Sequence, residues 1–243
     1  SAIPTPTNKE QLHTIKKKFI IDENLIVDNP EDMEAEILES KVHIVTVSSA
    51  STRNIENCLK QCDLMVDRIV LDSIANSEAM LTQEEKDGGV CLIDFGAGVT
   101  SYSVFQEEGI VRSGIIPMGG DDVTQEVAFA FDTSFEEAKR LKEDYGYAKS
   151  SAIKGEQFVE FVQTNKDSHQ LSNLQLSEVI EETYVDILLT LKNELRHHNL
   201  EANIKSGFVL CGGGAQALGC EELVRKFFTR RVKIGVVQRN RIS

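Results

Sequence analysis

The sequence predicts a mixed α/β fold, and three observations support that prediction. Three β-rich runs follow one another over residues 90–116 and are joined by turn-like residues, which is typical of an antiparallel meander. Apolar residues recur at helical spacing over 177–197. A glycine-rich segment also separates the strand-like run Phe208–Cys211 from a helix-like run. These patterns predict a sheet covered by helices.

The composition is that of an ordinary globular protein. Of 243 residues, 41% are hydrophobic and 27% are charged, and the apolar runs are too short for a membrane span. The length fits one large domain or two small ones. The 26 basic and 39 acidic side chains give a net charge of −13, which would repel a phosphate backbone. No nucleic-acid partner is therefore expected.

The five cysteines have neither metal-type nor CxxC spacing, and they are Cys58, Cys62, Cys91, Cys211 and Cys220. Three of them lie in apolar or strand-like runs, which predicts buried free thiols in a reducing cytoplasm. The chain opens at Ser1 without the charged and apolar regions of a secretory signal. We expect that its natural N-terminus is missing.

The expected elements up to residue 89 are, in order, a tail or linker over 1–11, strands at 19–26 and 42–47 with a helix or loop at 31–39 between them, a helix at 52–62, a strand at 68–71, a helix at 74–81 and a charged turn at 82–89. The helix at 52–62 is supported by Ile55, Cys58 and Leu59, which share one face.

The expected elements after residue 89 are strands at 90–93, 100–106 and 110–116, helices at 121–131 and from 133 or 134 to 145, a hairpin around 157–163, a helix at 177–197, a strand at 208–211, a helix at 221–228 and a strand at 232–237. Thr133 and Ser134 each precede a glutamate by three residues, which is the signature of a capping box. We expect a five-stranded sheet from the meander and the two late strands, with residues 132–205 as a separate small lobe.

The segment Asp94-Phe95-Gly96-Ala97-Gly98-Val99-Thr100 joins two of the expected strands. Glycines let backbone N–H groups approach anionic oxygens, the threonine adds a hydroxyl, and the aspartate offers a carboxylate to a hydrated metal ion. This pattern is typical of a phosphate loop. The same residues also suit a tight hairpin in which glycine supplies a positive φ, and the isolated motif does not separate the two interpretations.

A second glycine segment, Gly212-Gly213-Gly214-Ala215-Gln216-Ala217, stands between a strand and a helix. It fits the GxGxxA variant of a dinucleotide fingerprint, with a helix N-terminus available to an anion. The acidic ribose ligand of that fingerprint is absent, because Gln238 and Arg239 stand where it would be expected. A bare strand-to-helix turn is the alternative interpretation.

The two loops together describe half of the actin-like (ribonuclease H-like) ATPase fold, and the sequence resembles the FtsA family of actin-like bacterial cell-division proteins from about Leu12 to Gly235. The resemblance rests on six ordered segments: KVHIVTV (41–47), RNIENCLKQCDL with VDRIV (53–70), GGVCLIDFGAGVT (88–100), IIPMGGDDVTQEVAFAF (115–131), FEEAKRLKEDYGYA (135–148) and FVLCGGGAQALGCEEL (208–223).

The resemblance implies a nucleotide site, with ATP and Mg²⁺ as cofactors. In it, Asp94, Gly96, Gly98 and Thr100 match the second phosphate motif, with Asp94 reaching the metal through water, and Gly119 and Gly120 match a turn beside the nucleotide. Lys139, Lys142 and Glu143 fall where the family lines the adenine and ribose, although a solvated helix face is the plain alternative for them. Gly212, Gly213, Gly214 and Gln216 match the adenosine motif.

Three residues depart from the family pattern, because Val99 and Ser101 interrupt the run after the glycines and Cys211 replaces a small hydroxyl residue. The intact protein is therefore expected to be a weak ATPase at most, with no catalytic residue identified. Half of the family's phosphate cradle has no counterpart here, so nucleotide binding by this chain should be weak or undetectable.

The resemblance also implies a partial fold, mainly its second half with part of the FtsA-specific subdomain. Subdomain 1C would be partly present at 1–64, 65–88 would lead out of 1A, 89–131 with 206–243 would form 2A, and 132–205 would form 2B. The implied function is that of an ATP-binding adaptor that links FtsZ to the cytoplasmic membrane and helps to assemble the division septum. Subdomain 2B would receive the C-terminal tail of FtsZ, with Lys192, Arg196 or Lys205 available to its acidic groups.

The family forms actin-like filaments and lies on the cytoplasmic face of the bacterial inner membrane through a C-terminal amphipathic helix that this chain lacks. Two alternatives share the fold. One is a pilus-assembly scaffold of the PilM type, and the other is a sugar kinase or a DnaK-type chaperone ATPase. No residue here identifies the aspartate base that a kinase needs, and a chaperone would be a much longer chain.

Overall fold

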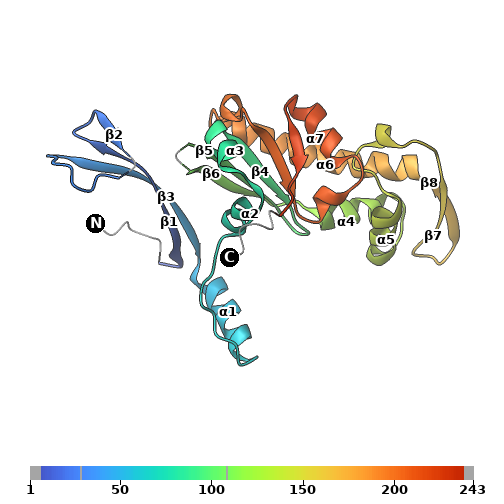
Figure 1. Ribbon diagram of the computed structural model, residues 1–243. Helices are drawn as coiled ribbons and strands as arrows, with labels where there is room; N and C mark the ends of the chain where they lie inside the picture. The colour runs from blue at the N-terminus through green and yellow to red at the C-terminus, as the bar shows by residue number, and fades with distance from the viewer. Residues whose placement is uncertain (1–6, 28, 108, 238–243) are drawn as a thin grey trace.

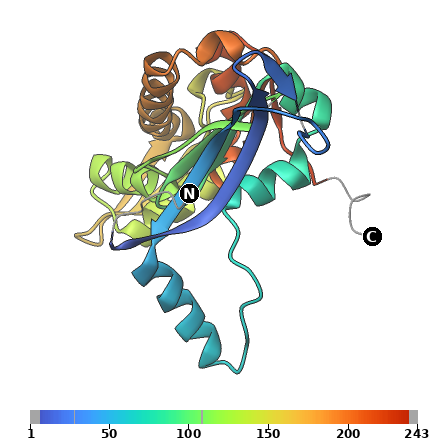
Figure 2. The same ribbon diagram turned by 90° about the vertical axis from the view of Figure 1, so that its left-hand side faces the viewer.

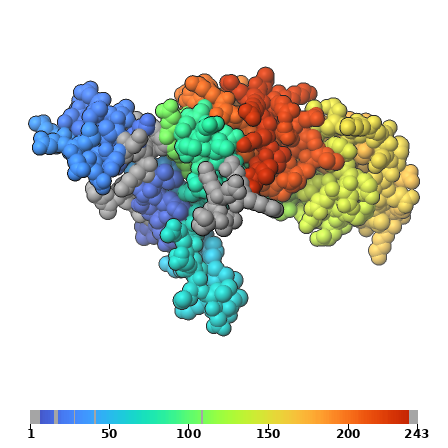
Figure 3. All heavy atoms as spheres, in the orientation of Figure 1, coloured from blue at the N-terminus to red at the C-terminus, as the bar shows by residue number. Residues whose placement is uncertain are grey.

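The computed structural model describes residues 7–27, 29–107 and 109–237. The N-terminal part is an antiparallel sheet of β1 (Lys9–Ile21), β2 (Leu25–Val27) and β3 (Leu38–Ser48), in the order β2-β1-β3. Helix α1 (Ser49–Lys60) follows, and it stands clear of the rest of the molecule together with the segment after it (Figures 2 and 3). Thr52 is the one buried residue of this helix.

The centre of the molecule is a five-stranded sheet in the order β10-β9-β4-β5-β6, as the sequence predicts. Strands β4 (Val90–Phe95), β5 (Thr100–Gln106) and β6 (Gly109–Ile116) form the antiparallel meander, and β9 (Gly207–Cys211) and β10 (Val232–Ile234) extend it in parallel. Because β4 and β9 are buried on both faces, their sequences are nearly continuous apolar runs. The cavity described below lies at the end of these two strands.

Helices cover both faces of this sheet (Figure 1). Alternate residues of β4 point to opposite faces. Cys91, Ile93 and Phe95 join a large core with residues of α4 (Gly120–Ala130), α5 (Phe135–Tyr145), α6 (Asn173–His197) and α7 (Cys220–Phe228). Val90 and Leu92 join a smaller core on the other face, beneath α2 (Asp72–Met80) and α3 (Gln83–Gly88).

The expected lobe over 132–205 lies at one end of the molecule, where α5 and the hairpin of β7 (Phe158–Val162) and β8 (Ser168–Ser172) are found (Figure 1). Two short 3₁₀ turns, Ser150–Ala152 and Glu201–Asn203, complete it. Residues of β7, β8 and α6 belong to the same buried core as the central sheet. The lobe therefore shares its core with the sheet instead of having a separate one.

Several expected boundaries are wrong. Strand β1 begins at Lys9, inside the expected tail, and the expected strand at 19–26 is broken after Ile21 by Asp22 and Glu23, which have positive φ. Residues 31–37 form no helix, 68–71 form no strand, and β10 ends at Ile234. The expected charged turn at 82–89 contains α3, capped by Thr82 and Glu85 in a capping box.

The cysteine prediction is correct for three residues and wrong for two. Cys91, Cys211 and Cys220 are buried free thiols, whereas Cys58 and Cys62 are exposed. The physical reason is the position of α1, which projects from the body and buries almost nothing. None of the helices in the described part of the chain is long and apolar enough to span a membrane.

Candidate functional site

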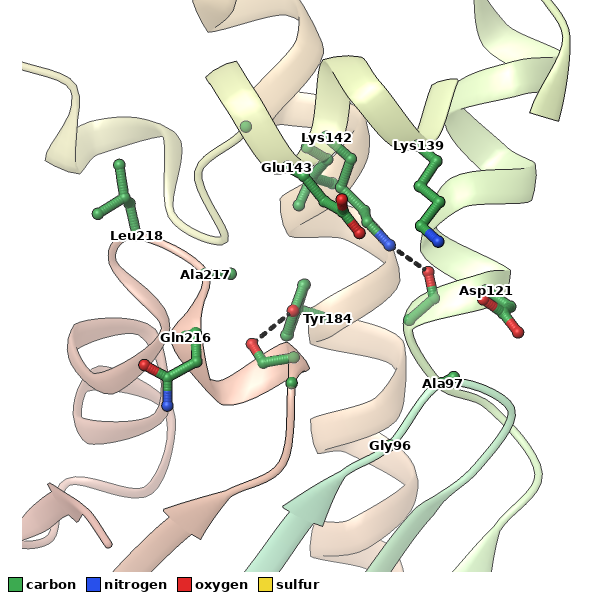
Figure 4. A pocket seen from close by; sticks show the side chains of 15 residues that line it. Gly96, Ala97, Asp121, Lys139, Lys142, Glu143, Tyr184, Gln216, Ala217 and Leu218 are labelled. Atoms are coloured by element: carbon green, nitrogen blue, oxygen red, sulfur yellow. Dashed lines mark hydrogen bonds between the residues drawn. The ribbon is translucent and has the colours of Figure 1, made fainter. Parts of the chain in front are cut away.

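A cavity of about 340 Å³ opens where five segments distant in sequence meet (Figure 4). These are the β4–β5 turn, the N-terminus of α4, helix α5, helix α6 and the turn after β9. Its lining comprises Gly96, Ala97, Gly120, Asp121, Lys139, Lys142, Glu143, Gly146, Ile180, Tyr184, Gly213, Gly214, Gln216, Ala217 and Leu218. The two glycine loops recognised in the sequence therefore face one space, with the α5 residues across from them.

The structure divides the expected site residues into two groups. Those that line the cavity are Gly96, Gly120, Lys139, Lys142, Glu143, Gly213, Gly214 and Gln216. Those outside the lining are Asp94, Gly98, Thr100, Gly119 and Gly212, each of which adjoins a lining segment in sequence. Sequence reasoning missed Ala97, Asp121, Gly146, Ile180, Tyr184, Ala217 and Leu218.

The β4–β5 turn packs directly on the N-terminus of α4. The N–H groups of Gly120 and Asp121 donate to the carbonyl oxygens of Gly96 (2.9 Å) and Ala97 (2.8 Å). A Cβ at Gly119 would lie 2.8 Å from the Gly96 oxygen and still closer to that of Ala97, so only glycine permits this approach. The first N–H groups of α4 are thereby satisfied within the chain and not left for an anion.

Thr100 does not offer its hydroxyl to the cavity. The residue has no exposed surface, and its Oγ1 donates to the carbonyl oxygen of Met118 at 2.9 Å. The contact with phosphate expected for this hydroxyl is replaced by a bond that holds the segment before α4 against β5. Gly98, by contrast, is exposed, and a Cβ added there would meet nothing within 4 Å.

Lys142 on α5 reaches across to α4 (Figure 4). Its Nζ donates to the Gly120 carbonyl oxygen at 2.8 Å and to Thr124 Oγ1 at 2.7 Å. Burial lowers the pKa of this ammonium group, and the nearby carboxylates of Glu143 and Asp121 oppose that effect. Lys142 thus acts chiefly as a tie between two walls, while Lys139 and Glu143 leave their charged groups for a ligand.

The opposite wall is the turn that follows β9. Gly212 has φ +84°, and a Cβ there would lie 2.5 Å from the Phe95 carbonyl oxygen and even closer to Asp94 Oδ1. Residues Gly214–Gln216 form a single 3₁₀ turn. The Tyr184 hydroxyl donates to the Gly214 carbonyl oxygen at 2.8 Å, and its ring lies 5.6 Å from that of Phe95. Burial raises the pKa of Tyr184, which keeps its hydroxyl protonated as a donor.

Asp94 lies behind this turn, at the end of β4. Asn76 Nδ2 on α2 donates to its Oδ2 at 2.9 Å, and the carboxylate of Asp72 is near. Burial raises the pKa of Asp94, the charge of Asp72 raises it further, and the bond from Asn76 opposes both. Sequence reasoning missed Asp72 and Asn76, because only the packing of α2 on the sheet brings them to Asp94.

The donor set suits an anionic ligand with a flat ring better than a protein-bound metal. Glycine backbone at 96, 213 and 214 lets a ligand approach closely, Ile180 and Leu218 supply apolar surface, and Lys139 and Glu143 supply opposite charges. Within the described ranges, no three His, Cys, Asp or Glu residues are grouped so as to hold a metal ion. A cation here would be shared between Asp94 and the ligand.

The cations expected to bind a partner are partly occupied. Arg196 Nε lies 2.8 Å from Glu201 Oε2, and Lys192 Nζ lies 4.9 Å from the centre of the Phe227 ring and 3.4 Å from that residue's carbonyl oxygen. Lys205 is exposed. The nearby hairpin has an apolar outer face, because Phe158 and Val162 are 68% and 48% exposed.

The meander, helix α4 and the strand–turn–helix of β9 and α7, with the cavity between them, define an actin-like ATPase fold. Two solved structures share it. MreB5 of Spiroplasma citri bound to ADP has a TM-score of 0.67 at 18% identity over 78% of this chain and 61% of that chain. The PilM–PilN type IV pilus biogenesis complex has a TM-score of 0.66 at 14% identity over 96% of this chain and 57% of that chain.

Within that class, residues 91–242 match the family model of cell division protein FtsA, and residues 1–46 match that of the SHS2 domain inserted in FtsA. The chain therefore belongs to the FtsA family of cell division proteins. Cell division protein FtsA of Pseudomonas aeruginosa is 34% identical over 236 residues, which are 97% of this chain and 57% of that protein. The chain thus spans little more than half the length of this relative.

Proposed function

We propose that this chain forms part of an actin-like division protein that binds an adenine nucleotide in the cavity, with Mg²⁺ held between the nucleotide and Asp94. The observation that carries the proposal is the convergence of both glycine loops with Lys139 and Glu143 on one cavity. The similar MreB5 structure is bound to ADP, which supports a nucleotide as the ligand of this fold. Gly98, Thr100, Gly119 and Gly212 then shape the loops, while the lining residues make the contacts.

The base and ribose should provide most of the affinity. Ile180 and Leu218 give apolar surface to a base, and Gln216, Lys139 and Glu143 carry groups that can bond to a ribose or base edge. On the phosphate side, the N–H groups of Gly96, Gly120 and Asp121 already donate to carbonyl oxygens of the chain. Few strong phosphate donors remain, so the affinity should be weaker than micromolar.

Titration of the chain with fluorescent ADP in the presence of Mg²⁺ tests this proposal. A Cβ at Gly213 meets nothing within 4 Å, so Gly213→Val should place its methyl groups in the cavity and weaken binding at least about fivefold. Gly155→Val is the matched control, because its Cβ also meets nothing within 4 Å and the residue does not line the cavity. Equal effects of both variants, or submicromolar affinity of the unaltered chain, would contradict the proposal.

We extend the proposal to the function of the whole protein, which is to link FtsZ to the cytoplasmic membrane while it assembles with further copies into filaments and helps to build the septum. Residues 132–205, the proposed 2B, would receive the C-terminal tail of FtsZ. The proposed assignments of 1–64 to 1C, 65–88 to 1A, and 89–131 with 206–243 to 2A accompany this. Membrane attachment would use an amphipathic helix outside residues 1–243.

The exposed face of the β7–β8 hairpin is the best candidate for the contact with the tail. Phe158 and Val162 can receive apolar side chains, and Lys205 remains available to an acidic one. A short peptide on a small apolar patch with few charges should bind with micromolar affinity that falls as salt is added.

Fluorescence polarisation with a labelled FtsZ tail peptide measures this contact. Phe158→Ala should weaken binding about tenfold, by the loss of roughly 1–2 kcal/mol of apolar burial. Ile115→Ala on β6 is the control, since both side chains are 68% exposed and Ile115 lies outside 132–205. An absence of binding at high protein concentration and low salt would remove the partner proposal and leave the nucleotide proposal standing.

A further inference from the structure

Two carboxylates, those of Asp72 and Asp94, approach each other behind the turn after β9. Asp94 is held at the end of β4 by the amide of Asn76 and by close contact with Gly212. Asp72, in the first turn of α2, accepts from its neighbour's backbone, Ser73 N, at 2.7 Å and from Ser101 Oγ at 3.4 Å. Each carboxylate is therefore fixed by uncharged donors only.

This pair lacks a balancing cation. No ion pair joins Asp72 or Asp94 to a Lys or Arg side chain within the described residues. Two negative charges held together repel each other, and a cation or a proton relieves that repulsion. The fixed geometry thus creates a place where a positive charge is favoured.

Unused hydroxyl groups lie in the same layer between α2 and the sheet. Ser73 is 4% exposed and Ser103 is fully buried, and neither Oγ has a hydrogen-bond partner. Ser103 shares a face of β5 with Ser101, which bonds Asp72, and Ser73 follows Asp72 directly. Buried polar groups are nearly always paired with protein or with ordered water. The layer is therefore suited to a hydrated ligand.

The carboxylates lie at the glycine end of the cavity and not at its Lys139–Glu143 end. Asp94 precedes Gly96 in the β4–β5 turn, and it touches Gly212, which precedes the lining residue Gly213. A ligand with its ring toward α5 would place its anionic end toward these carboxylates. An anion without a cation would then be repelled by two charges.

Building on the proposed nucleotide site, we infer that Asp72 is a specificity-determining residue that, with Asp94 aligned by Asn76, makes the site select a divalent-metal complex of a nucleotide over the free nucleotide. Asp94 alone would tolerate both forms better. With Asp72 beside it, the metal-free phosphates pay for two nearby negative charges, while a hydrated Mg²⁺ bridges carboxylates and phosphates.

The test compares fluorescent ADP binding with Mg²⁺ and with a chelator, at constant ionic strength set by NaCl. Asp72→Asn keeps the shape and the acceptor oxygen of this exposed residue but removes its charge. The variant should bind metal-free ADP about three- to fivefold more tightly than the unaltered chain and should lose the same factor from the strengthening that Mg²⁺ gives. Asp67→Asn, an exposed residue five positions earlier, is the matched control and should change neither value.

The outcomes are distinct. Tighter metal-free binding by Asp72→Asn alone supports the inference. If the unaltered chain binds ADP and Asp72→Asn gives the same two affinities, Asp72 has no such role, although the nucleotide proposal stands. If the unaltered chain binds no ADP with or without Mg²⁺, the nucleotide proposal and the role of Asp72 both fail.

Discussion

Gly212 and Gly213 are adjacent glycines that should respond to alanine in opposite ways. Gly212 has φ +84°, and a Cβ there would meet the Phe95 carbonyl oxygen at 2.5 Å and crowd Asp94. A left-handed conformation costs an alanine roughly 1 kcal/mol, and forcing a methyl group into backbone and side-chain atoms costs about 1–3 kcal/mol more. Gly212→Ala should therefore lose about 2–4 kcal/mol of unfolding free energy.

Gly213 is the internal control for this prediction. It has φ −64° and ψ −40°, which any residue adopts, and its Cβ would meet nothing within 4 Å. Alanine there restricts the unfolded chain, so Gly213→Ala should be unchanged or gain up to about 0.5 kcal/mol.

Urea unfolding followed by far-UV circular dichroism measures the difference. With a denaturant slope of about 3 kcal/mol per molar urea, Gly212→Ala should lower the midpoint by roughly 1 M, and Gly213→Ala should not lower it. A Gly212→Ala midpoint within about 0.2 M of the unaltered chain would refute the reasoning, because the turn could then move away from β4 without cost.

Three further predictions concern the walls of the cavity. Lys142→Met removes the donors to Gly120 and Thr124 and should lower the unfolding free energy by about 1–2 kcal/mol in urea, whereas Lys139→Met should cost under about 0.5 kcal/mol, and equal losses would contradict the role of Lys142 as a tie. Tyr184→Phe leaves the Gly214 carbonyl oxygen without its donor and should cost about 1 kcal/mol in thermal unfolding, and an unchanged midpoint would argue against that bond. Because the folded-state pKa of Asp94 is raised, its ionisation destabilises the fold as pH rises through the window above 3.8, so Asp94→Asn should gain stability relative to the unaltered chain between pH 4 and 7, and a pH-independent difference would show that the carboxylate is not perturbed.

Much of the sheet and part of the cavity could be predicted from sequence, because the signals were local. The meander is written as short β-rich runs between turn residues, and the register of β4 with β5 follows from the short turn between them. The two glycine loops were recognisable because positions such as Gly119 and Gly212 admit no Cβ.

The remaining features were hidden because they depend on packing. Tyr184 stands one turn after Ile180 on an apolar stripe and looks like any core residue, and only the crossing of α6 behind the β9 turn gives its hydroxyl a partner. Asp72 and Asn76 read as a helix start until α2 is placed on the sheet. Helix α3 has no apolar stripe, although Thr82 and Glu85 carried a capping signal that could have revealed it.

The same bonds that shape the cavity limit what it can hold. Gly96 and Ala97 accept from the N-terminus of α4, Lys142 ties that terminus to α5, and Tyr184 fixes the turn on the other side. Walls closed in this way need no rearrangement to receive a ring, which favours binding of a base. The backbone donors spent in closing them are lost to phosphate, so a cation must offset the charge that the backbone does not. Tight binding should therefore require both a purine-sized ring and a metal-bound phosphate, and neither adenosine nor magnesium pyrophosphate alone should bind as well as the complete metal nucleotide.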